Sequence, residues 1–112
     1  MKTLSTTLDF EQEVYERQVR ICKSFANTAR LHILELLGKR EHGISELQQQ
    51  LGVSKANLSQ HLAILKAAGV VVTRREGKQI FCSLAIPEVK QACQLIRSVL
   101  RAQIRNGRKL AV

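Results

Sequence analysis

Hydrogen-bonding side chains gather at the start of a helical stretch near the middle of the chain. Leu58, Leu62 and Leu65 recur there at i, i+4 and i+7, so that side of the helix must face a core. The outer side carries no acid and consists of Ser54, Lys55, Asn57, Ser59, Gln60 and His61. The amides of Asn57 and Gln60 can each pair bidentately with an adenine edge. The hydroxyl and amine groups suit phosphates, and the imidazole suits either partner.

Positive charge gathers in a second place, at residues 74–78. The run RREGK there separates two short stretches that are rich in β-branched and apolar residues. The glycine suits a turn, so we predict a basic-tipped hairpin over 70–85. Arg74, Arg75 and Lys78 would crowd one tight loop, where their mutual repulsion is unfavourable unless an anion such as a phosphate relieves it.

The cysteines do not form the pattern of a disulfide framework or of a zinc finger. Cys22, Cys82 and Cys93 are odd in number, far apart and without Cys-x-x-Cys spacing, so we expect reduced thiols. Cys82 alternates with Ile80 and Leu84 on the second strand of the expected hairpin, which indicates a core position. The histidines do not converge in sequence, and we expect no metal site built on them.

Hydrophobic periodicity predicts the elements that must hold these groups. The expected helices cover residues 9–25, 28–37, 45–51, 55–68 and 87–105. The fold class is therefore mainly α with a small β-hairpin, in the order four helices, two strands and a fifth helix. Segment 45–68 has the pattern of a helix-turn-helix, and the hairpin beside it would be a wing. We expect a single winged helix-turn-helix domain over 1–112.

Local signals predict where these helices begin and end. Asn27 and Ser45 are suitable N-caps for the second and third helices, and Gly38 is a natural stop for the second. Gly69 would end the fourth helix, and Pro87 suits the first turn of the last. The buried stripe of the second helix is expected at Ala29, Ile33, Leu36 and Leu37.

The charge distribution separates the chain into two halves. Residues 1–53 carry seven Lys/Arg and seven Asp/Glu, whereas residues 54–112 carry eleven Lys/Arg against two acids. This asymmetry points to a polyanion, either nucleic acid or an acidic membrane face. We see no signal peptide and no apolar run long enough to span a bilayer, so we expect a cytoplasmic protein without a membrane partner.

Other classes of function lack their motifs. The chain shows no Gly-rich phosphate loop, no His-Glu-x-x-His and no paired carboxylates, so we do not expect an enzyme. One tyrosine and three phenylalanines leave few aromatics for stacking on RNA bases. An RNA-binding module and a pure scaffold remain alternatives, and a scaffold would show no salt-sensitive DNA binding.

Three segments carry a family resemblance: FANTARLHILELL, ISELQQQLGVSKANLSQHLAILKAAGVV and TRREGKQIFCSL, within residues 25–84. They resemble the core of the ArsR/SmtB family of winged helix-turn-helix repressors. The resemblance implies a homodimer whose first and last helices, 9–25 and 87–105, make the interface. It also implies double-stranded DNA with an inverted-repeat operator as partner, residues 55–68 as the recognition helix, and repression released by an inducer.

The chain departs from the family's metal-sensing members. Their Cys-x-Cys, in the helix before the recognition helix, is replaced here by ISELQQQLG without a thiol. The last helix also lacks the Asp and His ligands of the family's zinc site. We expect no required cofactor and no confident metal site.

The inducer stays open between two interpretations. Because the family packs the first and last helices together, Cys22 and Cys93, in one subunit or across the dimer, could form a dithiol that oxidises, takes up sulfane sulfur or binds As(III). Otherwise they are small buried hydrophobes, and the inducer, if any, is not thiol-directed. Family members that sense persulfide carry a cysteine where this chain has Glu35. A row of arginines on the last helix is either a solvated face or a contact for phosphate or an inducer's carboxylate: Arg97, Arg101 and Arg105.

Overall fold

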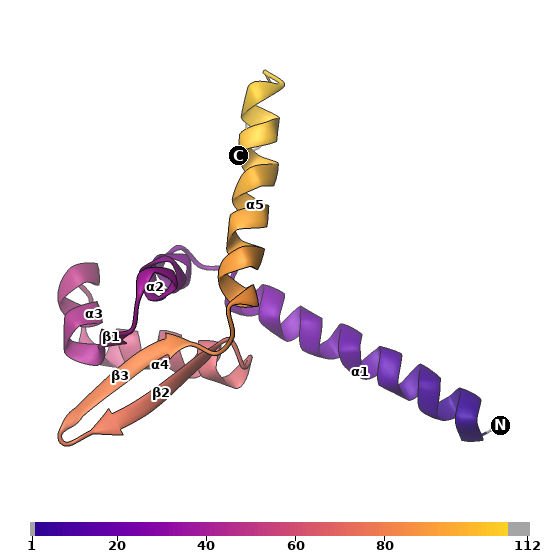
Figure 1. Cartoon of the computed structure of the whole chain (residues 1–112), viewed down its shortest axis with the longest axis horizontal. Coiled ribbons are helices and arrows are strands. Elements are labelled where there is room, and N and C mark those ends of the chain that lie inside the picture. The colour runs from indigo at the N-terminus through magenta and orange to yellow at the C-terminus, as the bar shows by residue number, and fades with distance from the viewer. Residues whose placement is uncertain (1, 108–112) are drawn as a thin grey trace.

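The computed structural model describes residues 2–107 and consists of a small body from which two helices project (Figure 1). The body contains α2 (Thr28–Lys39), α3 (Ile44–Leu51), α4 (Lys55–Ala67) and a sheet of β1 (His42–Gly43), β2 (Val71–Glu76) and β3 (Gln79–Leu84). The projecting helices are α1 (Lys2–Ser24) and α5 (Glu88–Arg105). The expected class, mainly α with a small hairpin, is confirmed. Among the described helices, none is long and apolar enough to cross a membrane.

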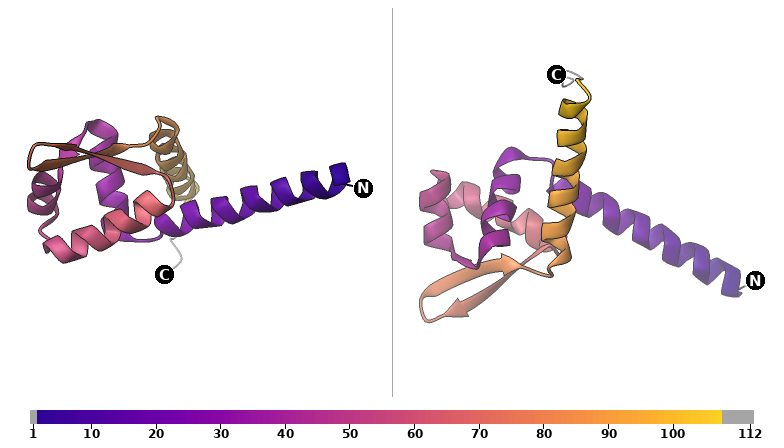
Figure 2. Two further views of the ribbon diagram at one scale, coloured as in Figure 1. Left: turned by 90° about the horizontal axis from the view of Figure 1, so that it is seen from below. Right: turned by 45° about the horizontal axis from the view of Figure 1, so that its top comes forward.

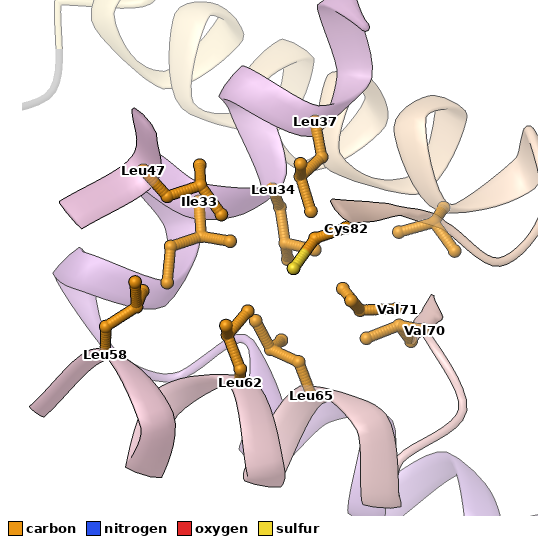
Figure 3. Close-up of a cluster of buried hydrophobic side chains, with 11 residues drawn as sticks. Ile33, Leu34, Leu37, Leu47, Leu58, Leu62, Leu65, Val70, Val71 and Cys82 are labelled. Atoms are coloured by element: carbon orange, nitrogen blue, oxygen red, sulfur yellow. The ribbon is translucent and has the colours of Figure 1, made fainter. Parts of the chain in front are cut away.

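The core lies between α2, α4 and the sheet. Leu58, Leu62 and Leu65 are buried on α4, as their spacing predicts, and Figure 3 shows them directed towards α2. Cys82 is fully buried in the same cluster, which confirms its core position. Burial raises the pKa of its thiol and keeps it protonated. On α2 the buried residues are Ile33, Leu34 and Leu37, whereas Ala29 and Leu36 are only half-buried, so the predicted stripe is partly wrong.

Several helix boundaries differ from the expectation. Helix α1 begins at Lys2, well before residue 9, and α2 continues through Gly38 to Lys39. Gly38 packs against the side chain of Lys90 from α5. This tertiary contact stabilises α2 beyond a glycine, a residue type that commonly ends helices. The cap of α3 is Gly43, and Ser45 lies inside the first turn.

The predicted Asn27 cap of α2 is confirmed, and the structure adds a cap at Ser54 and a turn at Gly52. The Asn27 side chain accepts a hydrogen bond from the Arg30 N–H at 3.1 Å, and the Ser54 hydroxyl oxygen accepts one from the Asn57 N–H at 3.1 Å. Gly52 adopts a left-handed φ of 66° and ends α3, which creates the turn into α4.

The hairpin turn is tighter than the sequence suggests. Arg74 pairs with Phe81 and Arg75 with Ile80, which leaves only Gly77 and Lys78 in the turn. The expectation of three cations crowded in one loop is therefore wrong, because both arginines belong to strand β2. The sheet also has a third strand that sequence analysis missed, since β1 pairs with β3 in the order β1-β3-β2.

A cluster that we name the Arg74 clamp ties the wing to the body. Arg74 donates to both carboxylate oxygens of Glu41, from Nε at 2.9 Å and from Nη2 at 2.6 Å, and to Glu76 at 2.8 Å. The guanidinium also lies 4.6 Å from the ring centroid of Phe81. Glu41 directly precedes β1, so the clamp joins the start of β1 and α3 to the hairpin. The hydrogen bonds from Arg74 lower the pKa of Glu41.

Acidification should release the clamp. Because the folded pKa of Glu41 lies below its ordinary value of 4.5, the pair stabilises the fold above that value and the stabilisation is lost as the pH falls through the folded pKa. We expect the Arg74→Met variant to lose less of its urea stability than wild type between pH 6 and pH 3. The matched control is Arg75→Met on the same strand, which should keep the wild-type pH dependence. Equal pH profiles for wild type and Arg74→Met would contradict the clamp.

Substitution by alanine should change the free energy of unfolding in opposite directions at Gly38, within α2, and at Gly52, directly after α3. A Cβ on Gly38 would meet only the flexible Lys90 stem, at 3.5 Å and 3.6 Å, so Gly38→Ala should raise the free energy of unfolding by about 0.5–1 kcal/mol. Gly52→Ala should lower it by about 1 kcal/mol, because its φ of +66° is unfavourable for alanine. Urea unfolding measures both. A destabilised Gly38→Ala would show that α2 needs the glycine for another reason.

Candidate nucleic-acid interface

The outer face of α4 presents the hydrogen-bonding groups predicted from the sequence. Figure 2 shows α4 along one edge of the body, with its first turn at the end that also carries the hairpin tip. The exposed side chains on this segment are Ser54, Lys55, Asn57, Ser59 and Gln60. The leucine stripe on the opposite side of α4 fixes this orientation, because a buried i, i+4, i+7 row leaves the other positions outside. Two amides and one amine therefore stand within two turns of the start of the helix.

Ser54 has a structural role that leaves part of its chemistry free. Its hydroxyl oxygen accepts the Asn57 N–H and thus caps α4. A hydroxyl can accept and donate at once, so its hydrogen can still be given to an anion beside the helix. The N-terminus of α4 also carries the positive end of the helix dipole, which favours the same negative partner.

His61 is half-buried and is held by a residue that sequence analysis missed. Its Nδ1 lies 3.3 Å from Nη1 of Arg30 on α2. A guanidinium can only donate, so Nδ1 accepts and the ring proton lies on Nε2. Arg30 also donates to the carbonyl oxygens of Ser24 at 2.7 Å and Lys23 at 3.2 Å, at the end of α1. The only signal in the sequence is a basic residue close to the Asn27 cap, which does not reveal these partners.

A hollow of about 550 Å³ joins the start of α4 to the wing. We call it the α3–wing hollow; residues that line it include Ser45, Gln48, Lys55, Lys78, Gln79 and Phe81. Lys55 and Lys78, predicted separately as phosphate contacts, thus line one hollow. Glu46 also lines it, but its carboxylate is paired with Arg40. The amides of Gln48 and Gln79 were not predicted, because residues on α3 and the wing meet only in the folded chain.

The two wing arginines differ in how much of their charge is free. Arg74 is shared between Glu41 and Glu76 in the clamp, which raises its pKa and neutralises most of its field. Arg74 therefore needs no phosphate to relieve its repulsion, contrary to the expectation from sequence. Arg75 is exposed, and the described residues offer it no ion pair. Of the two arginines, Arg75 is the one that can attract a phosphate without first losing a carboxylate.

The two candidate sensor thiols line different hollows. Cys22 is exposed and lies in a shallow groove along α1 with Tyr15, Val19 and Ala26. Cys93 is half-buried between α2 and α5, where burial raises the pKa of its thiol and the charge of Arg97 partly opposes the effect. Both are free thiols, and residues 2–107 contain no group of three or more metal-binding side chains.

Large apolar side chains stay uncovered on both projecting helices. Phe10 is 65% exposed on α1, and Leu95 and Val99 are 68% and 60% exposed on α5. Val14, Tyr15, Ile96 and Ile104 are exposed as well. A soluble monomer rarely leaves such contiguous apolar stripes in water, so these helices have the character of an interface.

The chain matches known proteins over most of its length. The model of the family described as "Bacterial regulatory protein, arsR family" matches residues 27–73. The uncharacterised HTH-type transcriptional regulator Rv0081 of Mycobacterium tuberculosis is 37% identical over 90 residues, covering 80% of this chain and 79% of that protein. The biofilm growth-associated repressor of Xylella fastidiosa is 33% identical over 98 residues, covering 88% of this chain and 85% of that protein.

A solved structure extends the similarity to the fold. The homodimeric winged helix-turn-helix DNA-binding domain Mb0332 of Mycobacterium bovis, described as a possible ArsR-family transcriptional regulator, superposes with a TM-score of 0.79 at 26% identity. The match covers 93% of this chain and 95% of that one. The predicted winged helix-turn-helix and the predicted family are thus confirmed, as is the prediction that the chain is not an enzyme. This chain belongs to the ArsR family of bacterial regulatory proteins, which are DNA-binding transcriptional regulators.

Proposed function

We propose that the protein is a homodimeric repressor that binds an inverted-repeat operator sequence-specifically and is released by an inducer. The observation that carries this proposal is the outer face of α4, where the exposed amides follow Lys55, and Lys55 lines the α3–wing hollow together with Lys78. A major groove admits one helix, and its walls are the two phosphate backbones. The amides of α4 match the base edges inside the groove, and the lysines near α4 match the phosphates along its walls.

We assign each exposed side chain on this face to contact with either the bases or the phosphates of DNA. Asn57 and Gln60 read base edges, because their amides offer a donor and an acceptor in one plane. Lys55 and Lys78 hold phosphates on either side of the α3–wing hollow, and Arg75 extends this contact along the wing. Ser54 and Ser59 donate hydroxyl hydrogens to the same backbone. His61 and Arg74 act mainly through their bonds to Arg30 and Glu41, and this separates them from the residues that touch DNA.

The dimer is proposed to form through α1 and α5. On α5 the exposed Leu95 and Val99 lie on the side of the helix away from α2, as the 100° rotation per residue requires. These residues have no cover within residues 2–107, and a second copy would supply it. A two-fold dimer would place two α4 helices in successive major grooves, about 34 Å apart.

The proposal of repression follows the relative from Xylella fastidiosa, which is named a repressor; a relative from Vibrio cholerae, HlyU, is named a transcriptional activator, so the direction of regulation is part of the proposal. For the inducer, the structure favours the interpretation without a dithiol. Cys22 and Cys93 line separate hollows in one chain, and the raised pKa of Cys93 lowers the fraction of reactive thiolate. The position where persulfide sensors carry a cysteine holds Glu35, whose carboxylate is paired with Arg97.

Base-reading and phosphate-holding residues should fail in different ways. Gln60→Ala should cost about 1–3 kcal/mol on the operator and little on unrelated DNA, because it loses base contacts. Lys78→Ala should weaken both DNAs alike and lower the slope of log K against log salt by about 1. Fluorescence anisotropy over a salt series measures both. A sequence-selective loss for Lys78→Ala would overturn its assigned role.

Dimerisation should depend on the outer side of α5. Val99→Asp would bury an unpaired charge in the interface, so we expect the dimer dissociation constant to rise at least about 100-fold. The control is Gln94→Asp, which adds the same charge about 140° around α5 from Val99, on the side that faces α2. Sedimentation equilibrium measures the dissociation constants, and circular dichroism checks that both variants are folded. A Val99→Asp protein that stays dimeric would place the interface elsewhere.

A further inference from the structure

A second hollow, of about 480 Å³, lies between α2 and α5 on the side away from Leu95 and Val99. We call it the α2–α5 hollow. Four aliphatic side chains line it, Leu31 and Leu34 from α2 and Ile96 and Leu100 from α5. Leu34 is buried, whereas the other three are 41–56% exposed, so the hollow presents an open apolar surface. Its volume lies in the range of sites for small organic ligands, about 300–1,000 Å³.

Charged groups stand at the rim of the α2–α5 hollow. Lys39, Lys90 and Arg97 line it together with one acid, Glu35. Arg97 donates to both carboxylate oxygens of Glu35, at 2.6 Å and 3.3 Å, and this pairing lowers the pKa of Glu35. The pair is therefore ionised and internally neutral. No ion pair among the described residues includes either lysine, so the rim carries two uncompensated positive charges.

The two lysines stand at one end of the hollow. Lys90 lies in the first turn of α5, and its methylene groups cover Gly38, 3.5 Å and 3.6 Å from where a Cβ would stand. Lys39 follows Gly38 at the end of α2. From Lys90 to Leu100 the helix rises about 15 Å, so the apolar lining extends away from the ammonium groups by several turns.

We propose that the α2–α5 hollow binds a medium-chain carboxylate, with its anionic head at Lys39 and Lys90 and its aliphatic chain along the leucine and isoleucine lining. A ligand without charge would leave both ammonium groups unmatched, and a two-chain lipid exceeds the volume. The alternative occupant is an apolar helix of a second copy. A helix with side chains is about 10–12 Å wide, far wider than one aliphatic chain, and the Glu35–Arg97 pair that joins α2 to α5 at the rim opposes so wide an occupant.

The proposed site names the chemical class of the inducer. The regulatory part of this inference rests on the proposed function. Helix α2 belongs to the body that holds α4, and α5 belongs to the proposed dimer interface. A chain wedged between α2 and α5 changes the angle between the body and the interface. The spacing of the two α4 helices then departs from that of successive major grooves, and operator affinity falls.

Binding is tested by isothermal titration of decanoate into the full-length protein without DNA. We expect one decanoate per protomer, with 1-decanol and decylamine at least about tenfold weaker. The Lys39→Met/Lys90→Met double variant should lose at least about tenfold, whereas Arg101→Met, a charge loss on the same helix outside the hollow, should bind as wild type. Gly38→Leu should also lose binding, because it fills the hollow without removing charge and improves helix propensity.

Three results would overturn the site: no decanoate binding to the folded dimer, equal affinity for decanoate and decanol, or wild-type affinity in both the double-lysine and the Gly38→Leu variants. The first is also the result expected if the partner's helix fills the hollow.

The regulatory part is measured separately on operator DNA. Saturating decanoate should weaken operator binding at least about tenfold in wild type and leave Gly38→Leu unchanged. Bound decanoate with unchanged operator affinity would refute the inducer role alone. If the protein binds decanoate but shows no salt-dependent affinity for DNA, the proposed function is refuted and the decanoate site is kept. If it binds DNA but not decanoate, the site is refuted and the proposed function is kept.

Discussion

The burial of three leucines on α4 is the constraint on which the rest of the molecule depends. Leu58, Leu62 and Leu65 pack on α2 and the sheet, and each side chain of this size gains about 1.5–3 kcal/mol from leaving water. Rotating α4 about its axis would expose all three at once, so the helix has one orientation. The polar side is then held outwards by the core and needs no contact of its own. The exposed amides on that side make no contact that the fold needs, so they can be exchanged without loss of the fold.

The parts of the fold that sequence analysis predicted correctly are those that local spacing determines. The leucine stripe of α4 and the Asn27 cap each depend on residues within two turns of one another. The parts it missed depend on distant partners. Arg74 meets Glu41 across 33 residues, and β1 exists only because β3 pairs with it. Gly38 was predicted as a stop because the sequence does not show that α5 packs against that turn.

The candidate site divides in the same way. Which residues of α4 lie outside was predictable, because it follows from which residues lie inside. That Lys55 and Lys78 line one hollow was not, since their distance depends on how the hairpin folds back over α3. Sequence analysis treats Arg74 and Arg97 as unpaired charges. In the structure Arg74 pairs with Glu41, 33 residues before it, and Arg97 pairs with Glu35, 62 residues before it. A count of cations therefore overstates the positive field at the wing, where Arg75 and Lys78 are the cations outside the ion pairs of the described residues.

Arg30 gives this architecture a consequence for its evolution. One guanidinium holds the last carbonyls of α1 and the imidazole of His61 on α4. The backbone carbonyls are acceptors in any sequence, but position 61 must keep an acceptor for as long as position 30 keeps an arginine. Replacing His61 alone with a residue that cannot accept removes this partner from Arg30, whereas replacing Arg30 alone removes the donor itself. Replacement of His61 should therefore be tolerated more readily once Arg30 has been replaced, even though 31 residues separate the two positions in the chain.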